Sequence, residues 1–208
     1  MDLLAPQPSL FPKLRSPAAT AGATRPGPGS HPVFFAILPP PDFEPELRRT
    51  VETCRRWGVG ASLGAPETRH ISLVALGFAQ LLTAEQRAAA EDAAASLTFS
   101  PFTLRFDQVA SFRAKPGNKR PLVLLPADQA PLAALTTALR MAIIERGLVP
   151  QRPPARFHLT LCYDRADLRT RAIAPLTLRV DRFTLVRSVF GETRYEHWGE
   201  WPLDPAGR

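Results

Sequence analysis

Apolar residues along the chain fall into two kinds of segment. Short apolar runs bounded by proline, glycine or charged residues predict buried strands at 32–39, 68–76, 121–126 and 156–163. Segments with apolar residues three or four positions apart predict helices that begin near residues 42, 84 and 130. Alternating or β-favouring stretches predict further strands at 102–109, 176–189 and 194–203.

Residues at the helix ends support these assignments. We expect Asp42 to cap the first helix and Gly58 to end it. Thr83 and Gln86 have the spacing of a capping box, ahead of an alanine-rich helix that runs to about residue 96. The third helix carries leucine and isoleucine on one face and stops at Gly147.

The order of these elements is strand, helix, strand, helix, strand pair, helix, strand, strand pair, which is roughly one unit written twice. It predicts an α+β fold of two lobes, with mostly antiparallel sheets and helices outside. Residues 1–30 are rich in proline, alanine, glycine and serine and have no apolar period. We interpret them as a disordered extension, or a result of start-site choice, and expect the folded domain to span 31–208.

Composition narrows the possible partners. Of 208 residues, 45% are hydrophobic, enough for a buried core, and the net charge is +7. That charge favours an anionic partner, such as nucleic acid or a phosphorylated small molecule, although solubility alone also explains it. The two cysteines make no disulfide framework, and no apolar stretch approaches a membrane span of about 20 residues. We expect a cytoplasmic monomer without a membrane partner.

One tetrapeptide pattern occurs twice, each time in an apolar run. It reads His70-Ile71-Ser72-Leu73 and then His158-Leu159-Thr160-Leu161. In a strand, residues i and i+2 share a face, so each motif places an imidazole and a hydroxyl together over an apolar backing. The two other histidines lack the pattern, because Val33 follows His31 and Gly199 follows His197 at i+2.

Two such pairs suit the chemistry of a phosphodiester. One imidazole accepts a proton from the nucleophile while the other gives a proton to the leaving oxygen. The hydroxyls of Ser72 and Thr160 donate hydrogen bonds to the non-bridging oxygens. No acidic cluster lies near either motif, and no glycine-rich phosphate loop of the Walker or Rossmann type is present. We therefore expect metal-independent catalysis without a cofactor.

These residues resemble the two-histidine phosphoesterase superfamily, whose mark is the paired motif seen here as HISL and HLTL. The closest resemblance is to the bacterial 2′-5′ RNA ligase / RNA 2′,3′-cyclic phosphodiesterase family. The opening FFAILPP, the helix after it, and the ending VRSVFGETRYEHWGEWPL are all similar to that branch. The resemblance covers about residues 33–203.

The resemblance implies a bilobal, pseudo-twofold fold with a central cleft that holds both motifs. It implies hydrolysis of a 2′,3′-cyclic phosphate to a 2′-phosphate, with His70 and His158 as the catalytic pair and Ser72 and Thr160 as phosphate donors. His70 would protonate O3′ and His158 would activate water, an order that pseudo-symmetry leaves open. Reversible 2′-5′ RNA joining would be a secondary activity.

The chain departs from the family pattern at two places. Ser72 stands where threonine is usual, which keeps the hydroxyl. After the second motif, many relatives have a small residue and then arginine, whereas this chain has Cys162, Tyr163 and Asp164. An extra phosphate contact is therefore missing unless Arg165 supplies it from the next loop.

Four further side chains are candidates for binding or catalysis. Phe34 would stack on a base or pack in the core. Arg113, in the basic loop 113–120, would contact nucleic acid or simply be solvated, and Arg165 would lie at the rim of the site. Cys162, two residues after Thr160 and therefore expected on the same face as the histidine, is a weaker candidate for a nucleophile.

The expected partners are RNA ends or small cyclic-phosphate nucleotides. Two alternatives remain: a phosphoesterase for small cyclic nucleotides, and an RNA- or nucleotide-binding module whose histidines only contact phosphate.

Overall fold

The computed structural model describes residues 31–189 and 192–204. The strands in this part of the chain are β1 (Pro32–Ile37), β2 (Ile71–Phe78), β3 (Phe102–Ser111), β4 (Arg120–Pro126), β5 (Leu159–Asp164), β6 (Arg171–Val180), β7 (Arg182–Ser188) and β8 (Tyr195–Pro202). The α-helices are α1 (Glu44–Arg55), α2 (Ala84–Ala95) and α3 (Ala130–Glu145). Short 3-10 turns are η1 (Pro41–Phe43), η2 (Pro66–Thr68) and η3 (Ala79–Leu81).

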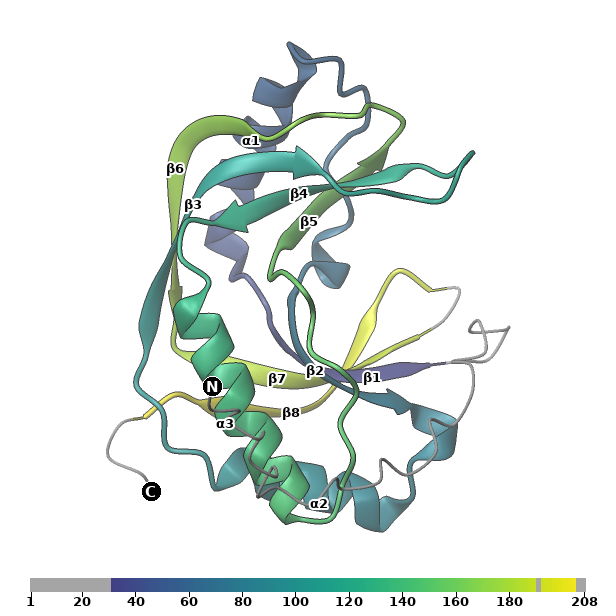
Figure 1. Cartoon of the computed structure of the whole chain (residues 1–208), viewed down its shortest axis with the longest axis vertical. Coiled ribbons are helices and arrows are strands. Elements are labelled where there is room, and N and C mark those ends of the chain that lie inside the picture. Colours follow the sequence, from purple (N-terminus) through teal and green to yellow (C-terminus); the bar gives the residue numbers. More distant parts are fainter. Residues whose placement is uncertain (1–30, 190–191, 205–208) are drawn as a thin grey trace, which may run out of the picture.

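The strands form two four-stranded antiparallel sheets (Figure 1). The first sheet has the order β2-β1-β7-β8 and the second has the order β5-β4-β3-β6. Both sheets therefore have a histidine strand at one edge, β2 in the first and β5 in the second. Beside each lies a strongly apolar strand, β1 or β4, as a pseudo-twofold arrangement requires.

Helices are exchanged between the two sheets. Helix α1 joins two strands of the first sheet but packs with the second sheet. There, the ring of Phe43, the residue just before α1, has its centroid 6.4 Å from that of Phe106 in β3. Conversely, α3 joins two strands of the second sheet and contacts β2 and α2 (Figure 1). One continuous apolar cluster, including Phe35, Leu73 and Leu124, therefore runs through both halves.

The structure confirms the predicted helices and the antiparallel pairing, but it corrects the end of the predicted order: the stretch expected as one strand at 176–189 is two strands, β6 and β7, which are separated at Asp181 and belong to different sheets. The Thr83–Gln86 capping box is present. Asp42 does not cap the first helix, because it lies inside η1, and α1 begins at Glu44 without a side-chain cap. The strand predicted from 176 begins at Arg171, since its outer half is polar or exposed and lacks an apolar run.

Two other predictions concern the N-terminal extension and membrane spans. The extension predicted at 1–30 lies outside the described residues. Within the described ranges, no helix is both long and apolar enough to cross a membrane.

Candidate active site

The first motif lies at the start of β2, directly after the turn η2. His70 is the last residue before the strand, which begins at Ile71 rather than at 68 as predicted. Ile71 and Leu73 are fully buried, whereas His70 and Ser72 are half-buried. The imidazole and hydroxyl therefore share the side opposite the core, as the alternation predicts.

The second motif repeats this arrangement at the start of β5. His158 precedes the strand, Leu159 and Leu161 are buried, and His158 and Thr160 are half-buried. Below we call the face of each sheet that carries its histidine the histidine side. A small apolar cluster backs each histidine side: Phe34, Ala36 and Val186 in the first sheet, and Ala110, Val123 and Leu125 in the second.

Both motifs contain a β-bulge at their fourth residue. In β2, Ser72 pairs with Ala36 and Val74 pairs with Phe35, so Leu73 has no partner. In β5, Thr160 pairs with Val123 and Cys162 with Leu122, which leaves Leu161 unpaired. Because a bulge shifts the alternation by one residue, two consecutive residues point into the core after each hydroxyl. The next residue then returns to the histidine side.

The two imidazoles are held by the same contact. Nδ1 of His70 lies 2.9 Å from the Thr68 carbonyl, and Nδ1 of His158 lies 2.9 Å from the Arg156 carbonyl. A carbonyl only accepts hydrogen bonds, so each Nδ1 carries a proton. In the neutral form of each ring, Nε2 therefore carries no proton and can accept one.

The residue before each histidine is fixed to the start of a helix. Buried Arg69 forms an ion pair with Glu44, the first residue of α1, and donates to the Gly64 carbonyl. Phe157 exchanges two backbone hydrogen bonds with the Gln129 side chain, at the N-terminus of α3, at 2.8 and 3.1 Å. The N-terminus of α1 thus holds the first motif through an ion pair, and the N-terminus of α3 holds the second motif through a side-chain amide.

The surroundings of the two rings differ. His70 lies between two aromatic residues, with ring centroids 4.9 Å from Phe34 and 5.4 Å from Tyr195. The Tyr195 hydroxyl is also 2.8 Å from its Nδ1. His158 has one aromatic neighbour, Phe112, at 4.8 Å. The first imidazole is thus more enclosed than the second.

This enclosure affects protonation. Burial lowers the pKa of His70, and the nearby His158 charge lowers it further, against an opposite effect of the Thr68 carbonyl. The contribution of His158 means that the two imidazoles, which come from different sheets, lie near enough to repel when both are charged. A charge on His158 therefore makes protonation of His70 less favourable.

Three other predicted residues have distinct positions. Phe34 is only 9% exposed, and its ring contacts His70 and Tyr195, which favours packing over base stacking. Arg113 is exposed and directly follows Phe112, so the basic loop begins beside His158. Arg165 is exposed at the bend after β5. Their roles in binding stay predictions.

The structure overturns the expectation that Cys162 lies on the histidine side. The bulge at Leu161 turns Cys162 into the core, where it is 4% exposed. Burial and the neighbouring Asp164 raise the pKa of its thiol to about 11, so it is not an available nucleophile at neutral pH. Tyr163 takes the place on the histidine side and is 58% exposed.

Sequence reasoning missed two residues that contact the imidazoles, Tyr195 and Phe112. Tyr195 lies 125 positions after His70, and nothing in its own strand pattern indicates that they meet. Phe112 follows the end of β3, outside any periodic segment. Only the pairing of strands distant in sequence brings these rings to the histidines.

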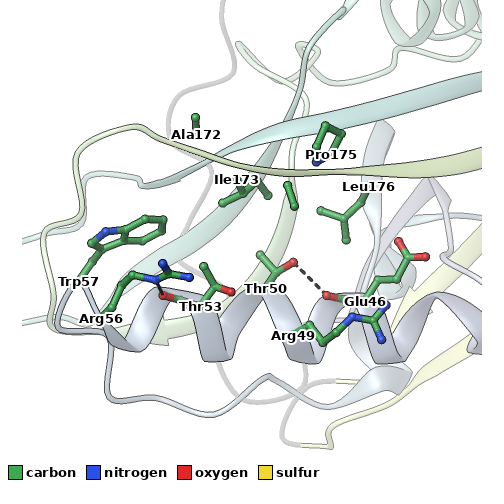
Figure 2. A pocket seen from close by; sticks show the side chains of 11 residues that line it. Glu46, Arg49, Thr50, Thr53, Arg56, Trp57, Ala172, Ile173, Pro175 and Leu176 are labelled. Carbon is green, nitrogen blue, oxygen red and sulfur yellow. Dashed lines mark hydrogen bonds between the residues drawn. The ribbon is translucent and has the colours of Figure 1, made fainter.

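Three hollows outlined by described residues have linings that include neither His70 nor His158. One, of about 630 Å³, lies between α1 and β6, lined by Arg49, Arg56, Trp57 and Pro175 among others (Figure 2). The others lie around the β1–α1 connection and along the outer side of α1. The cleft expected between the motifs stays a prediction.

Two antiparallel four-stranded sheets, each with a His-x-Ser/Thr-x motif on its edge strand, define the architecture of a two-histidine phosphoesterase. The chain belongs to the 2′-5′ RNA ligase superfamily, whose family model matches residues 39–191, including both motifs. No protein with a curated description matches the sequence.

Solved structures agree with this assignment. The apo crystal structure of E. coli LigT matches with a TM-score of 0.60 and 25% identity, over 85% of this chain and 99% of LigT. LigT complexed with NADP+ matches with a TM-score of 0.60 and 26% identity, over 84% of this chain and 98% of LigT. The protein TT0787 of Thermus thermophilus, with a TM-score of 0.64 and 18% identity over 83% of this chain and 97% of its own, shows the common fold.

Proposed function

We propose that the protein is a metal-independent RNA 2′,3′-cyclic phosphodiesterase that produces 2′-phosphate ends. Family membership already places it among phosphoesterase and ligase enzymes. The observation that carries the finer proposal is the pair of imidazoles, each with Nδ1 bound to a carbonyl and close enough to affect the other's charge. A hydroxyl beside each ring, on Ser72 and Thr160, supplies donors for the non-bridging oxygens.

The lowered pKa of His70 favours the reverse of the acid–base order that the family resemblance implies. A ring that is neutral at pH 7 takes a proton, so His70 Nε2 removes one from water as the water oxygen bonds to phosphorus. The bond from phosphorus to O3′ breaks, and O3′ receives a proton from His158 Nε2. The product is a 2′-phosphomonoester with a free 3′-hydroxyl, and solvent exchange restores the starting protonation.

The test is hydrolysis of an oligonucleotide that ends in a 2′,3′-cyclic phosphate, in the presence of EDTA. We expect a 2′-phosphate product, and a rate about 10²–10⁴-fold lower for His70→Ala and for His158→Ala. His197→Ala is the matched control, because His197 is exposed and lacks the motif. A metal requirement, a 3′-phosphate product, or losses of only a few-fold would contradict the proposal.

Small cyclic nucleotides are the alternative substrate. Crystals of E. coli LigT hold 3′-AMP or NADP+, which are small nucleotides rather than oligonucleotides. Comparing kcat/KM for a cyclic mononucleotide with that for the oligonucleotide decides between them. A binding module without catalysis would bind both in a salt-dependent way and convert neither.

A further inference from the structure

Tyr163 occupies an unusual position for an aromatic residue. It is the one aromatic among the large apolar side chains that are exposed in the described part of the chain, the others being Leu81, Met141, Ile144 and Val149. The bulge at Leu161 places it on the histidine side of β5, three residues after Thr160. It also lies near Tyr195 of the first sheet, whose pKa its phenol contributes to raising.

The equivalent position in the first motif is small. Counting from the bulge at Leu73, Ala75 matches Tyr163, and it packs beside Phe34 and the partly buried Tyr195. The aromatic surface near His70 is thus covered by the protein itself. At the equivalent position of the second motif, in contrast, the ring of Tyr163 remains open to solvent.

The backbone on both sides of Tyr163 is fixed. The Leu161 carbonyl accepts a hydrogen bond from the Gly64 amide at 2.7 Å. The Asp164 carboxylate accepts from the amides of Gly60, Ala61 and Ala166 at 2.6–3.0 Å. An aromatic ring on such a rigid strand loses little conformational freedom when a planar group stacks on it.

We propose that Tyr163 is the platform on which the nucleobase of the cyclic-phosphate nucleotide stacks. The site then prefers nucleotides to base-free cyclic phosphates, with little preference among bases, because every base has a π-face. This inference rests on the proposed function, whose phosphate would lie between the histidines while the base extends over the second sheet.

The test compares adenosine 2′,3′-cyclic monophosphate with the base-free 1,4-anhydroribitol 2,3-cyclic phosphate. We expect Tyr163→Ala to raise KM for the nucleotide about 10- to 100-fold, and to change KM for the base-free substrate less than about twofold. Tyr163→Phe, which keeps the ring, should restore most of the lost affinity. Val149→Ala, a change at a 90% exposed residue after α3, is the control and should match the wild type.

A binding measurement separates failure of this inference from failure of the proposed function. Adenosine 2′-monophosphate and the base-free 2-phosphate are titrated into His158→Ala and into the His158→Ala/Tyr163→Ala double variant. Loss of the preference for the nucleotide in the double variant supports the stacking role even if the wild type hydrolyses neither substrate. Equal effects of Tyr163→Ala on both ligands, or none on either, would overturn it.

Discussion

The two histidines occupy half-sites that share a backbone and differ in their surroundings. Both rings donate from Nδ1 to the carbonyl two residues earlier, and both motifs bulge at their fourth residue. The first half-site, however, encloses His70 between Phe34 and Tyr195, whereas in the second His158 has the single aromatic neighbour Phe112. The shared backbone positions two equivalent nitrogens, and the more enclosed surroundings of the first lower the pKa of His70.

A change of leaving group should give the largest difference between variants of the two histidines. A p-nitrophenyl phosphodiester needs no proton on departure, so it bypasses the acid but not the base. We expect His158→Ala to lose about 10²–10⁴-fold on a cyclic phosphate and less than about tenfold on the nitrophenyl ester. His70→Ala should lose heavily on both. If His70→Ala instead released nitrophenol almost normally and His158→Ala did not, His70 would be the acid and His158 the base, as the family resemblance implies.

The anchors before each histidine should differ in their effect on stability. Arg69→Met removes a buried ion pair, and we expect the free energy of unfolding to fall by about 3 kcal/mol. Gln129→Ala leaves two backbone groups of Phe157 unpaired and should lower it by about 2 kcal/mol.

Urea denaturation measures both anchor variants. Arg48→Met is the control, since Arg48 pairs with the same Glu44 at 2.9 Å but is exposed, and it should lower the free energy of unfolding by less than about 1 kcal/mol. A loss in Arg48→Met as large as that in Arg69→Met would show that burial does not distinguish the two arginines.

The pH dependence of kcat/KM tests the lowered pKa of His70. Because burial lowers the pKa of His70, the base is lost only as pH falls through a value below 6.5, and the acid limb of kcat/KM should lie there. The Tyr195→Phe variant lacks an oxygen that lies 2.8 Å from Nδ1 and stabilises the charged ring, so this limb should move to a still lower pH. An acid limb that moves upward would rule out that role for the hydroxyl.

The smallest effect is expected at Cys162. Its thiol is buried behind the bulge, so Cys162→Ala should leave kcat within about twofold of the wild type, as followed by product formation. Resistance of the native protein to thiol-directed reagents gives an independent check. Rapid labelling together with loss of activity would mean that this residue is accessible after all.

The alternation of apolar and polar residues predicted the strands and the two imidazole–hydroxyl pairs, because i and i+2 share a face whatever the rest of the chain does. It failed after Thr160, where the sequence Leu-Cys-Tyr does not reveal a bulge: each of these side chains fits either face. Contacts such as that of Tyr195 with His70 depend on which strands become neighbours. That choice is made by packing over the whole molecule rather than by local pattern.

The exchange of helices between the sheets makes each half of the molecule depend on the other for its stability. A chain that contained only one of the two repeated units would expose the apolar face of its helix and leave its own sheet uncovered. The first sheet also takes β7 and β8 from the C-terminal end of the chain, so neither half of the sequence completes and covers its own sheet, and the two lobes are expected to unfold together rather than one after the other.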